Sequence, residues 1–294
     1  MTWFLTCLLF LRAQEDLSRA DIKVDFTETV TMVNLPVRVW HRGGHVPNLR
    51  AEEVEVVENG VVVQLNRLDQ IKTPLTLHFL FDLSTSNARH IYLAKKVVDD
   101  IIGKMKSEDL GKISFFSSHY QPLTDYTGDQ KNLRRKLAAL SSVGSTALYD
   151  GVTGALEELG RVSGNRVLIL FSDGHDLLSH TSETDLMIKV KNYRIPIVLV
   201  VFRGRKKETG LLAQQTRFME SVAHESGGAV IESGSTLNRD LSGLLRQMRL
   251  RYLARYRPPD PANADQWRSL VVRINGCAEC LLDYRRAYRI SGLD

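Results

Sequence analysis

The spacing of apolar residues between Pro74 and Arg249 alternates between the period of a strand and that of a helix. Segment 75–82 is almost continuously apolar, and segment 87–106 places six apolar side chains on one helical face: Ile91, Ala94, Val97, Val98, Ile101 and Ile102. The alternation continues and predicts strands at 112–118, 166–171, 196–202 and 229–231, and helices at 130–140, 147–162, 183–193, 211–225 and 237–249. Such alternation is typical of a mostly parallel sheet covered by helices on both faces. We therefore predict a doubly wound α/β domain over 74–249.

The segments on either side of this domain follow the two-residue period of β-strands. Residues 22–73 contain the dipeptide Asn59-Gly60 between two β-branched runs, which is a strong hairpin signal. In 250–290, Tyr252, Ala254 and Tyr256 share one face of a strand. Neither segment is long enough for a comfortable core of its own, so we expect one small β-sandwich, split in sequence, into which the α/β domain is inserted.

Charge is distributed unevenly along the chain of 294 residues, whose net charge is +5 and whose pI is about 9.1. Residues 246–294 carry ten arginines and five acidic residues, whereas the N-terminal β segment carries Glu52, Glu53, Glu55 and Glu58. We expect cross-strand Arg–Glu pairs that contribute a fraction of a kcal/mol each. The arginines follow strands and do not cluster in a nucleic-acid-binding motif, so we predict no nucleic-acid partner. The compact basic run 203–207 is expected to be a solvated loop or a contact for an acidic partner.

An apolar run at 3–11 is too short to cross a bilayer, which needs about 20 residues. Because Arg12-Ala13-Gln14-Glu15 follows it, the run resembles the core of a secretory signal with cleavage near Ala13. We therefore predict that 1–20 are a signal peptide and linker, and that the protein is secreted or periplasmic with no membrane span. The alternative is a buried or merely hydrophobic N-terminus, since no Lys or Arg precedes the run.

Cys277 and Cys280 would be the only cysteines of the exported protein, because Cys7 lies in the predicted signal. One C-x-x-C pair supplies half the ligands of a structural zinc, and no nearby His or second pair completes the set. A disulfide closing a small loop is expected if the chain is exported. A thioredoxin-like redox role is disfavoured, because the motif lies in a turn between strands and not at a helix start.

Three separated segments carry oxygen ligands at positions where a sheet would bring them together. Asp82-Leu83-Ser84-Thr85-Ser86 follows the first buried strand, Thr146 lies where a Gly-containing loop enters a helix, and Asp173 ends a second apolar strand. In open α/β sheets, ligands bind beyond the carboxyl ends of the strands. Hydroxyl and carboxylate oxygens suit a small hard cation, so the pattern predicts a Mg²⁺ site.

Three segments together resemble the metal-ion-dependent adhesion site of von Willebrand factor A domains. They are the D-x-S-x-S loop, Thr146 in G-S-T-A-L-Y-D-G and Asp173 in F-S-D-G. Every position of that motif is filled here. The resemblance implies that Ser84, Ser86 and Thr146 bind Mg²⁺ directly, and that Asp82 and Asp173 act mostly through waters. It also implies an open coordination position for an Asp or Glu of a protein partner. Mn²⁺ and Ca²⁺ are alternative ions.

The flanking segments carry a second, less specific resemblance. Residues 37–60, together with 252–258 and 285–288, are similar to the leading and closing segments of bacterial VWA-related proteins known from acidobacteria. This similarity implies a fold and an exported location, and it does not imply a biological role.

The sequence contains no G-x-S-x-G, H-E-x-x-H, P-loop or G-x-G-x-x-G motif at a strand–helix junction. We therefore predict no catalytic and no cofactor-binding residues, and a non-enzymatic, metal-dependent protein-binding or adhesion module. One alternative is a structural assembly factor of a cell-envelope complex, in which the ion only stiffens loops. Another is a Mg²⁺-assisted phosphoester hydrolase. His175 is expected to border the metal site without a chemical role.

Overall fold

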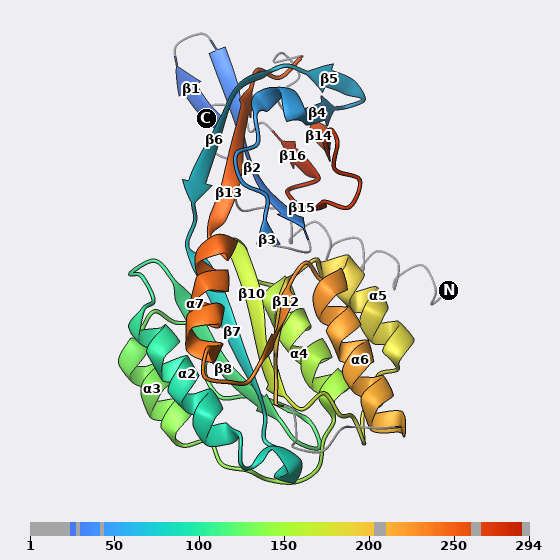
Figure 1. The fold of residues 1–294 in the computed structure, drawn as a ribbon. Coiled ribbons are helices and arrows are strands. Elements are labelled where there is room, and N and C mark those ends of the chain that lie inside the picture. The colour runs from blue at the N-terminus through green and yellow to red at the C-terminus, as the bar shows by residue number, and fades with distance from the viewer. Residues whose placement is uncertain (1–23, 28–29, 42–43, 203–209, 260–265, 290–294) are drawn as a thin grey trace, which may run out of the picture. The chain divides into compact units, whose positions relative to one another are not determined.

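The computed structural model describes residues 24–27, 30–41, 44–202, 210–259 and 266–289. They belong to two compact units (Figure 1). One unit is the contiguous segment Pro74–Arg246, and the other combines the chain up to Thr73 with the chain from Gln247. The predicted signal peptide and the basic run 203–207 lie outside the described residues. In the part of the chain that is described, no helix is long and apolar enough to cross a membrane.

The contiguous unit is an α/β unit built on a mostly parallel sheet. The strand order is β12-β11-β10-β7-β8-β9, and all neighbouring pairs are parallel except β8 with β9. Figure 1 shows helices on both sides of this sheet. Its strands are β7 (Leu75–Asp82), β8 (Leu110–Phe116), β9 (Tyr120–Pro122), β10 (Asn165–Ser172), β11 (Ile197–Val201) and β12 (Ala229–Glu232). Its helices are η2 (Thr85–Asn87), α2 (Ile91–Gly103), α3 (Gln130–Ala138), α4 (Leu148–Gly160), α5 (Glu183–Tyr193), α6 (Gly210–Glu225) and α7 (Leu237–Met248).

Burial on both faces explains the near-continuous apolar strands of this unit. Every residue of β7 and β11 is buried, as is nearly all of β10. One core cluster packs Leu80, Leu168 and Leu199 against apolar residues of α4, α5 and α6. On the same two neighbouring strands, Phe81 of β7 and Phe171 of β10 stack with ring centroids 5.1 Å apart. The pattern of a doubly wound, mostly parallel sheet therefore holds in this unit.

Two local features differ from the predictions. The helix predicted from residue 87 begins at Ile91, because Thr85, Ser86 and Asn87 form the short 3₁₀ helix η2. Ser, Thr and Asn hydrogen-bond nearby backbone and compete with a regular helix, which explains the later start. The antiparallel edge strand β9 was not predicted, since three residues that include Pro122 carry too little periodicity.

The second unit consists of two antiparallel sheets whose strands come from both ends of the chain. One sheet has the order β1-β2-β13-β6, with β3 and β15 also paired to β2, and the other has the order β16-β14-β4-β5. The N-terminal elements are β1 (Val24–Thr27), β2 (Val30–His41), β3 (Gly44–His45), η1 (Ala51–Glu53), β4 (Val54–Glu58), β5 (Val61–Val63) and β6 (Leu65–Lys72). The C-terminal strands are β13 (Leu250–Tyr256), β14 (Trp267–Ile274), β15 (Leu281–Asp283) and β16 (Ala287–Arg289).

Both sheets contribute to one hydrophobic cluster, which contains Leu35 of β2, Val56 of β4, Tyr256 of β13 and Val272 of β14. The predicted hairpin is confirmed: β4 and β5 pair antiparallel around Asn59 and Gly60, both of which have positive φ angles, 49° and 83°. The structure also contains the disulfide between Cys277 and Cys280, which was expected for an exported chain.

Arg–Glu pairs connect β4 to β14, as the charge distribution predicts. The Arg273 guanidinium lies 2.6 Å from Glu55 on an exposed face, and that of Arg268 lies 2.6 Å from Glu58 in the interior. Glu58 also accepts hydrogen bonds from the hydroxyls of Tyr256 and Tyr288, at 2.7 and 2.8 Å. A fully buried carboxylate depends on its partners far more than an exposed one does, so for Glu58 we predict a larger cost of losing the pair than the charge distribution alone suggested.

Candidate metal centre

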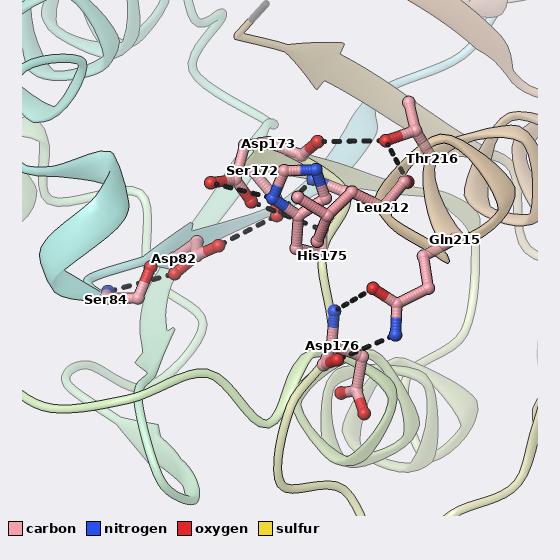
Figure 2. Close-up of polar contacts among 10 residues, drawn as sticks. Asp82, Ser84, Ser172, Asp173, His175, Asp176, Leu212, Gln215 and Thr216 are labelled. Carbon is pink, nitrogen blue, oxygen red and sulfur yellow. Dashed lines mark hydrogen bonds and ion pairs between the residues drawn. The ribbon is translucent and has the colours of Figure 1, made fainter. Parts of the chain in front are cut away.

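Asp82 and Asp173 come together because β7 and β10 are parallel neighbours. The register pairs Phe81 with Phe171, so both strands end at the same edge of the sheet. Asp82 is the last residue of β7, and Asp173 directly follows β10. Figure 2 shows the two aspartates together with Ser84 and with Ser172, the last residue of β10. Both carboxylates are buried, which is unusual for ionisable groups.

The Asp82 carboxylate is fixed in place by neutral donors. Its Oδ1 accepts a hydrogen bond from the Ser84 amide at 2.9 Å, and its Oδ2 accepts one from the Ser172 hydroxyl at 2.8 Å. Burial raises the pKa of Asp82 to about 6; hydrogen bonds from Ser84 and Ser172 oppose this rise, and the nearby Asp173 carboxylate adds to it. Within the described residues, Asp82 has no ion-pair partner.

Ser84, at 1% exposure, is nearly as inaccessible as the protein core. It occupies the position before η2, and its backbone carbonyl accepts hydrogen bonds from Asn87 and from the Ser142 hydroxyl. Ser86 lies within η2, but its side chain lies outside the described residues.

The loop that carries Thr146 is hydrogen-bonded to the loop that carries Ser84. The Val143 amide donates to the Leu83 carbonyl at 2.7 Å, and the Thr85 hydroxyl donates to the Gly144 carbonyl at 3.0 Å. Gly144 has a φ of +77°, a conformation that favours glycine at this turn. These bonds bring Thr146, which is buried, to the same end of the sheet as Asp82.

Asp173 is held by the loop that follows it. Its Oδ1 accepts a hydrogen bond from the His175 amide at 3.2 Å, and its Oδ2 lies 3.5 Å from His175 Nδ1. The Asp173 carbonyl accepts a long hydrogen bond, 3.5 Å, from the Thr216 hydroxyl of α6 (Figure 2). His175 therefore borders the site, as the sequence predicts.

Two further residues next to the site were missed in the sequence. Asn87 is 2% exposed, and neither its amide nitrogen nor its amide oxygen has a hydrogen-bond partner in the described structure. His90 stacks on Phe202 at 4.8 Å; burial lowers its pKa, and the Asp173 carboxylate opposes that change. The sequence offered only an asparagine directly after the D-x-S-x-S motif; its burial without a partner, which is unusual for an amide, is seen only in the structure.

This environment fits a divalent cation with oxygen ligands. A buried carboxylate that faces a second carboxylate and lacks a basic partner is stabilised by an added positive charge. The described residues contain no cluster of three or more His, Cys, Asp or Glu that could hold a metal, and the buried oxygen donors gathered at this end of the sheet include hydroxyls of Ser84 and Thr146. Hydroxyl-rich shells are typical of hard ions such as Mg²⁺ and exclude a thiolate-type zinc site.

Comparisons with known proteins agree with a fold of the von Willebrand factor A type. A von Willebrand factor type A protein from Catenulispora acidiphila superimposes with a TM-score of 0.51 and 12% identity, covering 90% of this chain and 74% of that one. Proximal thread matrix protein 1 from the mussel byssus gives 0.50 and 16%, covering 65% of this chain and 51% of its own length. No protein-family model and no curated protein sequence matches the chain. At these identities the similarity shows the fold alone.

Proposed function

We propose that this chain is a divalent-metal-dependent protein-binding module, in which Ser84, Ser86 and Thr146 hold a Mg²⁺ ion directly. Asp82 and Asp173 would act on the ion mostly through bound waters. When bound, the ion offers an open coordination position that takes a carboxylate of a partner protein. The observation that carries the proposal is the environment of Asp82, which is buried beside Asp173 without a described cationic partner.

The chain's own residues would orient the site before the ion arrives. The amide of Ser84 and the hydroxyl of Ser172 fix the two oxygens of Asp82, so little reorganisation is needed on binding. The bond between Val143 and Leu83 holds the Thr146 loop against the Ser84 loop. Asn87 would retain a water molecule, because its buried amide otherwise lacks a partner among the described residues.

We further infer that the two antiparallel sheets form a split β-sandwich that carries the α/β domain as an insertion. The shared hydrophobic cluster and the buried Glu58–Arg268 pair, which join N-terminal to C-terminal strands, support this organisation. We also propose that residues 1–20 direct export of the protein. We propose further that the flanking segments are related to those of the acidobacterial VWA-related proteins.

Calorimetric titration of the EDTA-treated full chain with MgCl₂ tests the metal site. We expect saturable binding by the wild type, loss of binding in Asp82→Asn, and wild-type binding in the control Asp99→Asn, whose carboxylate pairs with Arg134 away from the site. Saturating ion should also stabilise the fold, by about 2.7 kcal/mol at one hundred times the Kd. Absence of Mg²⁺ and Mn²⁺ uptake by folded protein would refute the proposal.

Affinity capture from envelope extracts, with and without EDTA, separates this function from its alternatives. Partner binding that is lost both with EDTA and in Asp82→Ala supports metal-mediated capture. Binding that survives both treatments indicates an assembly role without ion-mediated contact. Phosphoester turnover that is lost in Asp82→Ala would instead support a hydrolase.

A further inference from the structure

The loops around the candidate metal centre and the first turn of α6 expose large apolar side chains. Between 41% and 66% of each of these side chains is exposed, although the loops bury their polar ligands. Exposed apolar patches on a soluble protein often mark an interaction site. The residues are Val143, Leu177, Leu178, Leu211 and Leu212.

The backbone bonds that position the oxygen ligands also position these apolar residues. The amides of Leu177 and Leu178 both donate to the Thr146 carbonyl, each at 3.0 Å. The amide of Val143 donates to the carbonyl of Leu83, between Asp82 and Ser84. The main chains of Val143, Leu177 and Leu178 are therefore fixed beside the site, while their side chains are free of it.

The N-terminal part of α6 is connected to the same loops through Gln215 and Thr216. Gln215 donates from its side chain to the Asp176 carbonyl at 2.7 Å and accepts from the Asp176 amide at 3.4 Å. Thr216 contacts the Leu212 and Asp173 carbonyls, as Figure 2 shows. These contacts hold Leu211 and Leu212 on the strand-end side of the sheet, next to the loop of Asp173.

The charges on these loops restrict what kind of partner fits. Asp150 accepts hydrogen bonds from the amides of His180 and Thr181, and Asp176 accepts one from the Tyr149 amide. Together with Asp82 and Asp173, these carboxylates make the surroundings of the ion acidic. Within the described residues, a polyacidic segment or a phosphate-rich ligand would meet these like charges beside the ion, which disfavours both.

We propose that the partner presents a single Asp or Glu flanked by bulky apolar side chains, which cover the Val143, Leu177, Leu178, Leu211 and Leu212 surface. This inference rests on the proposed metal-dependent function and specifies its ligand. The carboxylate supplies the polar anchor, and the apolar flanks supply buried area at an interface whose loops are already ordered.

Selection of a random twelve-residue peptide library on the Mg²⁺-loaded full chain, with elution by EDTA, tests the proposal. We expect the eluted peptides to carry one acidic residue with Leu, Ile, Val, Phe or Trp within two positions of it. Enrichment of runs of acidic residues, of acids without apolar neighbours, or of no EDTA-eluted peptide at all would overturn the inference.

Matched variants then locate the contact. Two double variants remove the apolar contacts: Leu177→Ser with Leu178→Ser, and Leu211→Ser with Leu212→Ser. Each should weaken binding of a selected peptide about tenfold or more and leave Mg²⁺ uptake unchanged. Ile188→Ser is the control, since Ile188 is 52% exposed but lies on α5. This variant should bind the peptide as the wild type does. Circular dichroism verifies that each variant is folded. Equal peptide binding by wild type and both double variants overturns the inference.

The failure of this inference is distinguishable from failure of the proposed function. If calorimetry detects no Mg²⁺ uptake, the metal-dependent function itself fails. If Mg²⁺ binds normally but polyacidic peptides are selected, only the apolar contact surface is wrong.

Discussion

Each unit of the protein buries a carboxylate at the end of a strand, but the two carboxylates have opposite surroundings. Glu58, in the β unit, is fully buried with the guanidinium of Arg268 at 2.6 Å and two tyrosine hydroxyls as donors. Asp82, in the α/β unit, is 3% exposed and accepts hydrogen bonds from Ser84 and Ser172, which are neutral donors, while Asp173 lies nearby. Among the described residues, Glu58 has a cationic partner and Asp82 has none.

This difference is the one expected between a structural carboxylate and the ligand-binding carboxylate that the proposed metal site requires. A buried ion pair costs desolvation on both partners, so it persists where geometry and extra hydrogen bonds offset that cost. A buried carboxylate without a counterion keeps an unfavourable charge that a bound cation relieves. Glu58 therefore connects strands that lie far apart in the sequence, whereas the surroundings of Asp82 are those that the proposed cation would stabilise.

The largest effect is expected from Glu58→Gln, which leaves the buried Arg268 without its counterion. Unfolding free energy of the β unit should fall by about 3–5 kcal/mol. Urea denaturation followed by tryptophan fluorescence measures it, because the chain's three tryptophans, Trp3, Trp40 and Trp267, all lie outside 74–246.

Glu55→Gln is the matched control for this prediction, because Glu55 pairs with Arg273 between the same two strands but on the exposed face. Its cost should be below about 1 kcal/mol. Similar losses in the two variants would show that the burial of Glu58 is not what makes its pair important.

An intermediate effect is expected when the pH is lowered, which should destabilise the α/β unit. In this unit His78 is fully buried between the Ser114 and Tyr126 hydroxyls. Burial, with Lys112 nearby, lowers the pKa of His78 from 6.5 to about 3. Between these values the unfolded chain binds a proton that the folded chain does not, so stability falls as the pH falls. The loss from this group should reach about 2 kcal/mol at pH 5.

Urea denaturation followed by helical circular dichroism, between pH 7 and pH 4, gives the unfolding free energy of the wild type and of His78→Gln. The difference between the two free energies isolates the contribution of His78. Asp82 is present in both proteins, so its own titration cancels. We expect the loss toward low pH to be smaller in His78→Gln. Parallel profiles for the two proteins would show that His78 is not held neutral by the fold.

The smallest effect on the unfolding free energy is expected from Asp82→Asn in metal-free protein. Its sign should be opposite to that of Glu58→Gln. Removing an uncompensated buried charge should leave the unfolding free energy at pH 7 unchanged or raise it by about 1 kcal/mol. Thermal and urea unfolding with EDTA, followed by helical circular dichroism, measure it. A loss of several kcal/mol would mean that Asp82 is structural in the same way as Glu58.

Much of the fold was predictable from local patterns. The apolar runs of β7 and β10 and the helical faces between them indicated the α/β unit, since burial on one or both faces imposes a period on the sequence. The Asn59-Gly60 hairpin was predictable from the turn conformation that these residues adopt. The order of Asp82, Ser84, Ser86, Thr146 and Asp173 along the chain suggested a metal site, and its occupancy stays a prediction.

Other features depend on which distant residues meet, and local sequence does not specify that. Glu55 and Glu58 lie on opposite faces of one strand, and the packing of two sheets decides that Glu58 is fully buried while Glu55 stays partly exposed. The unpartnered amide of Asn87 and the apolar loops beside Thr146 likewise follow from loops joined by long-range hydrogen bonds. Periodicity sets which side chains share a face, whereas strand register and loop closure decide what lies opposite them, and these are properties of the whole folded chain.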